Sequence, residues 1–424
     1  MKEITAILIN YSDQSSLYKA LNSLNIISSK LHTIIVLLER DTSLHTMIDQ
    51  KLFANIEYHT FKANQAGKAL NDTISKIKSE YVLFLQETDY LAPQASSDSF
   101  AMNSSQAVLG HIYRYKNISL HLPLLVRTSL LQRNPFLLDH QLPFKEARFA
   151  IWLSNINDSL KFFKDGLVKQ SKQHTTPDLT EKLKFAKKYQ LEKIDTQHPT
   201  LSIVIANYNM EKYVETTIAS CLFQNEQAEQ VCIIDDGSTD NSYKQIKSWK
   251  NESKVQVFHK LNEGKARALN DLLAHVTSDF ILELDADDWL DPDAVSEIKK
   301  NLANSPEDVA VLYGNLRKWK QQTNDVLFKS LAMGRMVNGR KDLLSYRFPL
   351  GPRIYRTSSL KAIGGFPIVA YNNGRLYEDV SVLNRLIKIY RFQYVNFTVY
   401  NVREHKESIT RNNLDHWNAF LKTL

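Results

Sequence analysis

Short continuous apolar runs alternate with amphipathic stretches along the whole chain. Residues 4–9 and 81–85 form such runs in the first half, and residues 201–206 and 280–284 form them in the second half. Short apolar runs of this kind are typical of strands buried on both faces of a sheet. Their alternation with helical patterns predicts an α/β fold, with a mostly parallel sheet covered by helices on both faces.

The same order of segments occurs twice in the chain. Asn10-Tyr11 follows the first apolar run, and Asn207-Tyr208 follows the run that opens the second half. Three further pairs match in the same order, at a nearly constant offset: 34–38 with 231–234, 64–71 with 262–270, and 81–85 with 280–284. Such self-similarity predicts an internal duplication, and therefore two tandem Rossmann-like domains.

A polar stretch separates the two halves. Within it, residues 178–181 (Asp-Leu-Thr-Glu) are typical of a helix start, and a lysine-rich helix is predicted over 182–193. We therefore expect a first domain over residues 1–171, a helical linker over 172–199 and a second domain over 200–424.

Acidic residues of the second half follow two of its predicted strands. Residues 235–238 read Asp-Asp-Gly-Ser, and residues 285–288 read Asp-Ala-Asp-Asp. Either run alone is explained equally well as a turn. Ligands of open α/β sheets bind at the carboxyl ends of strands, and several carboxylates in one crevice repel unless a cation or donor groups compensate. Oxygen ligands favour Mg²⁺ or Mn²⁺, which would hold substrate phosphates. Asp291 precedes Pro292 as a helix N-cap would, so it is left out of the site.

Composition and charge narrow the class of protein. The chain of 424 residues is 43% hydrophobic and 23% charged, as in globular proteins, and it has no apolar run long enough to cross a bilayer. With no recognisable export signal at its start and two isolated cysteines expected as buried thiols, it is expected to be cytoplasmic. The net charge of +7 is explained either by binding of anionic partners or by a solvated, lysine-rich surface. It is also compatible with peripheral association at the inner face of a membrane. The basic residues are dispersed, which argues against nucleic acid, and no dinucleotide or P-loop glycine motif is present.

The ordered motifs resemble those of glycosyltransferase family 2, which has the GT-A fold. The resemblance covers about residues 201–411 and rests on these segments: 205–209, 235–238, 264–270, 285–288, 356–366 (RTSSLKAIGGF), 378–379 and 402–410. It implies a metal-dependent enzyme that transfers a sugar, with inversion, from a nucleoside-diphosphate sugar to an acceptor hydroxyl. A UDP-sugar is the expected donor, a carbohydrate or polymer the expected acceptor, and cell-envelope or surface polysaccharide synthesis the expected setting.

The resemblance also implies roles for individual residues. The nucleotide sugar would be bound by Ala206, Tyr208, Asp235, Lys265 and Asp285, the metal by Asp287 and His405, and Asp379 would be the general base beside Glu378. Several have a plainer alternative: Tyr208 as an aromatic residue that closes a strand, Lys265 as part of a solvated helix face, and His405 as a loop histidine. Glu378 and Asp379 are also what the macrodipole favours in a first helical turn.

The first half keeps the apolar frame but lacks the carboxylates. Thr88 stands where the second half has Asp287, and Ala147 stands near the place of Asp379. We therefore expect the first domain to be a degenerate, non-catalytic copy that serves acceptor binding, homo-oligomer formation, partner docking or support. The alternatives are a second active transferase in the first half, and a nucleotide-sugar-binding scaffold in which neither half turns over.

Overall fold

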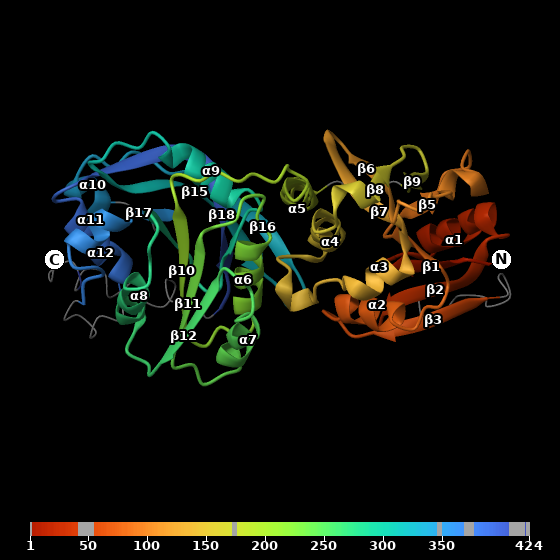
Figure 1. The fold of residues 1–424 in the computed structure, drawn as a ribbon, viewed down its shortest axis with the longest axis horizontal. Coiled ribbons are helices and arrows are strands. Elements are labelled where there is room, and N and C mark those ends of the chain that lie inside the picture. Colours follow the sequence, from red (N-terminus) through yellow and green to blue (C-terminus); the bar gives the residue numbers. More distant parts are fainter. Residues whose placement is uncertain are drawn as a thin grey trace. The chain divides into compact units, whose positions relative to one another are not determined.

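The computed structural model describes residues 2–40, 55–171, 176–345, 350–368, 377–406 and Phe420. The chain forms two compact units, Met1–Gln190 and Leu191–Leu424 (Figure 1). Each unit is an α/β domain with one large sheet.

Unit 1 is built on a seven-stranded sheet with the order β3-β2-β1-β4-β7-β6-β8. Its strands are β1 Ile4–Ile9, β2 Leu31–Glu39, β3 Ile56–Phe61, β4 Tyr81–Gln86, β6 Val108–Tyr115, β7 Ile118–Arg127 and β8 Lys161–Phe163. Two short strands, β5 Asp89–Leu91 and β9 Val168–Gln170, pair separately. The helices are α1 Gln14–Ser23, α2 Ala66–Ile74, α3 Thr128–Arg133, α4 Arg148–Ser154 and α5 Pro177–Lys188.

Unit 2 has a nine-stranded sheet with the order β12-β11-β10-β13-β17-β15-β18-β14, and β16 pairs with β15. Its strands are β10 Leu201–Asn207, β11 Gln230–Asp236, β12 Val255–Lys260, β13 Phe280–Glu283, β14 Trp289–Leu290, β15 Val309–Gln321, β16 Val326–Ala332, β17 Arg353–Arg356 and β18 Arg391–Glu404. Its helices are α6 Val214–Leu222, α7 Ser242–Ser248, α8 Lys265–Leu273, α9 Ala294–Leu302, α10 Arg340–Leu344, α11 Thr357–Ala362 and α12 Glu378–Leu386.

Both sheets are mixed: most of the described strand pairs of unit 1 are parallel, as expected, whereas unit 2 has as many antiparallel pairs as parallel ones. In unit 2, β12, β11, β10 and β13 run parallel, but β17 is antiparallel to both β13 and β15. A continuous apolar run reports burial on both faces and carries no information on strand direction. The sequence pattern therefore predicted the strands correctly and the direction of this part of the sheet wrongly.

The two sheets share their strand order and several equivalent hydrogen bonds. In unit 1 the Asn71 side chain donates to the Phe136 carbonyl at 2.8 Å and accepts from its N–H at 2.9 Å. In unit 2, Asn270 makes the same two bonds with Phe366, at 2.8 and 2.7 Å. This correspondence is what an internal duplication predicts.

The predicted linker helix lies inside unit 1. Helix α5 ends at Lys188 rather than Lys193, and the boundary between the units falls after Gln190. Leu183, Phe185 and Ala186 are buried, because the helix presents an apolar face to its own unit. Residues 172–175 of the expected linker lie outside the described residues.

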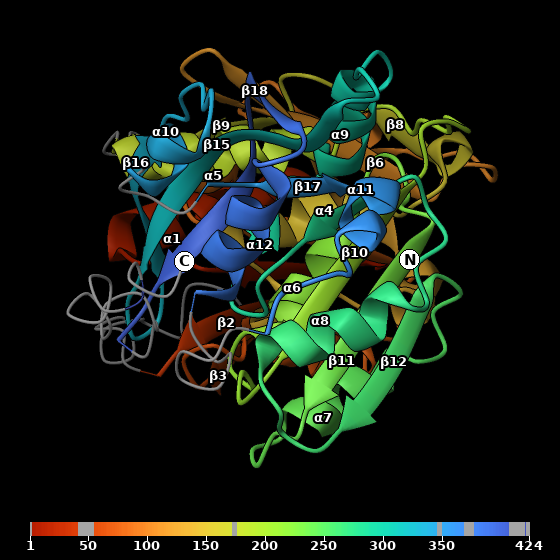
Figure 2. The same ribbon diagram turned by 90° about the vertical axis from the view of Figure 1, so that its left-hand side faces the viewer.

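Alternating residues of the unit 2 strands build one apolar core on each face of the sheet. Ile203 and Ile233 pack with α6 and α9, whereas Val204 and Ile234 pack with α8 and α12. Helices α8 and α12 therefore cover the same face, as Figure 2 shows. Both begin near the carboxyl end of β13, which places their first residues at the edge where the acidic runs lie.

The two cysteines, Cys221 and Cys232, are free and buried, as expected. Among the helices that the structure describes, none is long and apolar enough to cross a membrane.

Candidate active site

The carboxyl ends of β10 and β11 hold a buried carboxylate. Asp235 pairs in register with Asn207, is fully buried, and accepts a hydrogen bond from the Asn207 side-chain amide at 2.8 Å. It also accepts from the Ser238 N–H at 3.0 Å, and its other partner is the His259 ring at 3.1 Å. These hydrogen bonds therefore fix the Asp235 side chain at the carboxyl end of β11.

Two other predicted nucleotide-binding residues lie on β10 or directly after it. Ala206 is partly buried within the strand, and Tyr208 follows it with 46% of its surface exposed. An exposed ring beside a rigid strand end offers a flat apolar face to a planar ligand.

The second aspartate of the 235–238 run has a structural role. Asp236 accepts hydrogen bonds from the N–H groups of Glu263 and Gly264, at 2.9 and 2.8 Å. Gly264 has a φ of 98° and is the N-cap of α8. Asp236 therefore fixes the loop that leads into Lys265, the first residue of α8.

Lys265 lies among three carboxylates. Its ammonium contacts Asp285 at 2.5 Å, Glu283 at 3.0 Å and Glu378 at 3.2 Å. Burial disfavours the charged form, but the carboxylates outweigh it and raise the pKa of Lys265 well above its ordinary value. Lys265 therefore remains a cation and joins α8 to the ends of β13 and α12.

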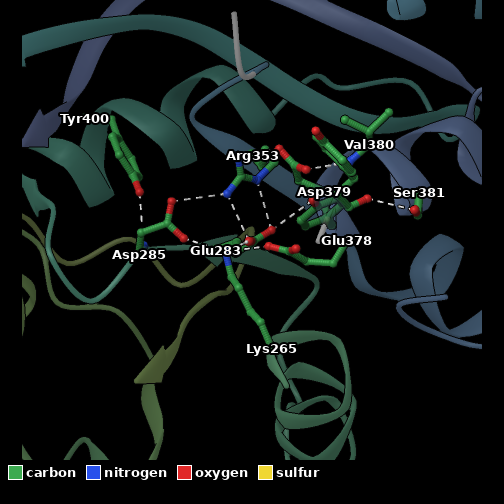
Figure 3. A network of polar contacts seen from close by, with 11 residues as sticks. Lys265, Glu283, Asp285, Arg353, Glu378, Asp379, Val380, Ser381 and Tyr400 are labelled. Atoms are coloured by element: carbon green, nitrogen blue, oxygen red, sulfur yellow. Dashed lines mark hydrogen bonds and ion pairs between the residues drawn. The ribbon is translucent and has the colours of Figure 1, made fainter. Parts of the chain in front are cut away.

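Arg353, the first residue of β17, lies on the other side of the same carboxylates (Figure 3). Its guanidinium donates to both oxygens of Glu283, at 3.0 and 2.9 Å, and reaches Asp285 at 3.5 Å. Burial by itself would raise the pKa of Glu283, yet Arg353 and Lys265 hold it below its ordinary range. Glu283 is thus a buried anion between two cations.

The proposed base is at the start of α12. Asp379 lies 3.8 Å from Arg353, measured from carboxylate oxygen to guanidinium nitrogen, and its other oxygen accepts from the Val380 N–H at 2.8 Å. Burial raises the pKa of its neighbour Glu378, although Lys265 opposes the shift. One network thereby joins three segments that are separate in the sequence: the start of α8 with Lys265, the end of β13 with Asp285, and the start of α12 with Glu378 and Asp379 (Figure 3).

The two predicted metal ligands also come together. The Nε2 atom of His405 lies 2.8 Å from an Asp287 carboxylate oxygen. Asp288 is directed elsewhere, because it accepts from the Arg403 N–H at 2.7 Å, and burial with the charges of Asp287 and Asp285 raises its pKa well above the ordinary value. Within the described residues, no cluster of three or more such ligand side chains is found.

Arg403 braces this strand end. Its Nε donates to the Asp287 carbonyl at 2.9 Å, and its guanidinium lies over the rings of Tyr213 and Trp289, at 4.8 and 4.7 Å from their centroids. These contacts fix the backbone that carries Asp287.

Three residues of this region were missed from the sequence: Asp236, Glu283 and Arg353. Asp236 was included in a motif but not distinguished from its neighbour. Glu283 ends the otherwise apolar strand β13 and Arg353 begins β17, and the charge next to apolar residues was the available signal.

Comparison with known proteins shows the family of the chain. The sequence profile described as Glycosyl transferase family 2 matches residues 202–362. An uncharacterized glycosyltransferase of Haemophilus influenzae is 38% identical over 217 residues, which are 50% of this chain and 83% of that protein. The chain belongs to glycosyltransferase family 2.

Other relatives of this family 2 protein are much longer. A chondroitin synthase of Pasteurella multocida is 29% identical over 229 residues, 51% of this chain and 22% of that protein. A hyaluronan synthase of Pasteurella multocida is 40% identical over 98 residues, 23% of this chain and 10% of that protein. The chain thus matches less than a quarter of the length of either synthase. Among solved structures, S. aureus TarS 1-349 in complex with UDP aligns with 48% of this chain and 60% of that chain, at 20% identity and a TM-score of 0.37.

Proposed function

We propose that the carboxyl edge of the unit 2 sheet transfers a sugar, with inversion, from a nucleoside-diphosphate sugar to an acceptor hydroxyl. The observation that carries the proposal is the network joining Asp285, at the end of β13, to Asp379, at the start of α12, within a family 2 glycosyltransferase. In this network the Arg353 guanidinium contacts both Asp285, which is proposed to bind the donor, and Asp379, which is proposed to act on the acceptor.

The donor would lie along the ends of β10, β11 and β13. The base would pack on Tyr208 beside Ala206 and Asp235, and the ribose would contact Asp285. Lys265 is the cation nearest to Asp285. Its ammonium would contact the diphosphate of the bound donor while it keeps its ion pair with Asp285. Each role follows from the family resemblance together with the position of the residue at this edge.

Asp379 would be the general base. It takes the proton from the acceptor hydroxyl as the oxygen bonds to the anomeric carbon, while the bond from that carbon to the diphosphate breaks on the opposite face. The proton ends on the Asp379 carboxylate and the electron pair leaves with the nucleoside diphosphate. Glu378 would stay beside the base, held by Lys265.

Asp287 and His405 fit a divalent cation. One carboxylate oxygen and one imidazole nitrogen lie 2.8 Å apart, and Mg²⁺ or Mn²⁺ commonly takes few protein ligands and completes its shell with water and substrate phosphates. A bound cation would neutralise charge on the departing diphosphate.

The relatives suggest the acceptor class. Two of them are named as chondroitin and hyaluronan synthases. We therefore propose a UDP-sugar as donor and a growing polysaccharide as acceptor.

Unit 1 would not share in this chemistry, because apolar residues take the places of the charged network. By strand register and helix position, Phe84 stands for Glu283, Leu124 for Arg353 and Ala66 for Lys265. Phe84 packs edge-on against Phe136 and Phe149, at 5.8 and 5.4 Å between ring centroids. Unit 1 would be a non-catalytic copy that holds the acceptor, docks a partner, self-associates or supports unit 2.

A screen of the purified chain against nucleotide sugars tests the proposal. We expect release of UDP that requires Mn²⁺ or Mg²⁺, rises with a polysaccharide acceptor, and stops on chelation. A chain that binds UDP but releases none from any donor, with any acceptor, would contradict it.

A further inference from the structure

Arg353 connects the two sides of the proposed site. Its guanidinium reaches Asp285 at 3.5 Å and Asp379 at 3.8 Å, and 7% of its side chain is exposed. Burial disfavours the charge of Arg353, but Glu283 and Asp285 outweigh it and raise its pKa well above the ordinary value. A permanent cation therefore lies next to the group that must accept a proton.

A cation this close works against a general base. An opposite charge within about 4–6 Å typically lowers the pKa of an aspartate by about 1–3 units, which weakens it as a proton acceptor. Arg353, however, directs its two shortest hydrogen bonds to Glu283 rather than to Asp379. Glu283 is 1% exposed, so its negative charge is poorly screened and offsets that of Arg353.

We propose that Glu283 and Arg353 are a positioning pair that sets the proton affinity of Asp379: Arg353 orients the base, and Glu283 offsets the charge that would otherwise weaken it. The proposal rests on the proposed role of Asp379 as the base. Neither member of the pair touches the reacting atoms.

Among the described residues, the other charged and titratable groups near Asp379 come from three elements. Tyr355 of β17 faces it and donates its hydroxyl to Glu283 at 3.0 Å. Glu378 precedes it on α12, and Lys265 of α8 reaches Glu378 at 3.2 Å. Tyr355 and Lys265 both contact Glu283, so Arg353→Gln, which alters neither of these contacts, is the cleaner of the two single variants.

The test is the pH profile of kcat, whose acidic limb reports the base in the enzyme–substrate complex. Arg353→Gln removes the cation and leaves Glu283 less compensated, so the limb should move to higher pH by about 1 unit or more. Glu283→Gln removes the anion, so the charge of Arg353 acts on Asp379 without an offset. The acidic limb of the kcat profile should move to lower pH, and the plateau value of kcat should fall. The double variant removes both charges, and its limb should lie between those of the two single variants.

Arg356→Gln is the matched control. Arg356 lies on the same strand and carries the same charge, but it donates to the carbonyls of Val309, Ser305 and Pro306. Its limb should stay within about 0.3 units of the parent, well below the shift an adjacent charge produces.

Lower activity with an unmoved limb in both single variants would reduce the pair to a structural role and overturn the proposal. If a single variant does not fold, Arg353→Lys serves instead. Lysine keeps the charge but cannot span Glu283 and Asp379 together, so its limb should also rise, and an unmoved limb contradicts the pair. Failure of the proposed function is a different result, namely no nucleotide release by the parent chain.

Discussion

Single buried carboxylates behave differently according to the partners around them. Asp89 of unit 1 is 2% exposed, and its oxygens accept from the Gln170 amide at 3.1 Å and weakly from the Gln86 N–H at 3.4 Å. Burial raises its pKa to about 7. Glu283 of unit 2 is equally buried but pairs with two cations, which lower its pKa.

Asp89 gives unit 1 a pH-dependent stability. Its folded pKa is raised, so its contribution to stability is complete below the unfolded pKa of about 4 and is lost as pH rises to about 7, a loss of roughly 4 kcal/mol. Asp89→Asn stays neutral, so its urea midpoint should fall less between pH 5 and pH 8 than that of the parent, with hydrogen exchange of β4 reporting on unit 1. An equal loss of stability with pH in parent and variant would contradict this.

His405 provides a second test at the residue scale. If it binds the cation with Asp287, His405→Ala should raise the Mn²⁺ concentration for half-maximal rate by about 10-fold or more, because a ligand is lost. The measurement is nucleotide release against Mn²⁺ concentration. His275→Ala is the control, since His275 lies two residues beyond the C-terminal end of α8, at the other end of the helix from Lys265, and stacks on Phe258. Identical Mn²⁺ curves for His405→Ala and the parent would remove His405 from the site.

At the residue scale, the motifs indicated which residues lie together, and the roles given to these residues stay predictions. Asp287 and His405 were predicted as a pair and lie 2.8 Å apart. Glu283 and Arg353 were not predicted as site residues, because they become significant only as partners that face each other across antiparallel strands. That register is not encoded in any local pattern, so pairing of distant charges could not be read from the chain alone.

At the scale of elements, the loop between β11 and α7 depends on one glycine. Gly237 has a φ of 70°, and a Cβ there would lie 2.6 Å from the Asn262 backbone nitrogen. This close approach brings Asp236 onto the N-terminus of α8. The turn therefore sets the start of the helix that carries Lys265.

Gly237→Ala should strain this turn and displace the loop before α8. We expect a loss of stability of about 1–2 kcal/mol or more and a higher KM for the donor, measured by urea unfolding and by initial rates. Gly339→Ala is the control, because Gly339 is extended at φ 173° and, its two chain neighbours aside, no atom of the described residues lies within 4 Å of its added Cβ. Equal effects of the two substitutions would contradict the role given to Gly237.

Elements were predicted from the sequence better than their arrangement. The apolar runs identified β1, β4, β10 and β13, and the flanking polar residues identified the helices that follow. The antiparallel β17 and the place of α5 within unit 1 were not predicted, because both are decided by packing between segments far apart in the chain.

At the scale of the whole molecule, the two sheets share their strand order but have different side chains at the carboxyl ends of their strands. Unit 2 has Asp287 where unit 1 has Thr88, and Phe84 of unit 1, which packs on Phe136 and Phe149, takes the place of Glu283. The proposal that only unit 2 is catalytic follows from this contrast. The sequence predicted it through the lost carboxylates, and the structure adds what took their place.

Substitutions at equivalent positions test this division. Thr88→Ala in the full chain should leave nucleotide release within about twofold of the parent, since the general-base and metal residues proposed here all lie in unit 2. Asp287→Asn should reduce it by about 100-fold or more at a fixed, low Mn²⁺ concentration. A large loss in Thr88→Ala would give unit 1 a part in the reaction.

The most direct test of the central claim compares two aspartate variants in one assay of UDP release. Asp379→Asn keeps the shape of the proposed base and should lower kcat by about 10²–10⁴-fold. Asp308→Asn changes the same group at an exposed ion pair with Arg391 and should leave kcat near that of the parent. An Asp379→Asn chain as active as the parent would contradict the assignment of glycosyl transfer to this crevice.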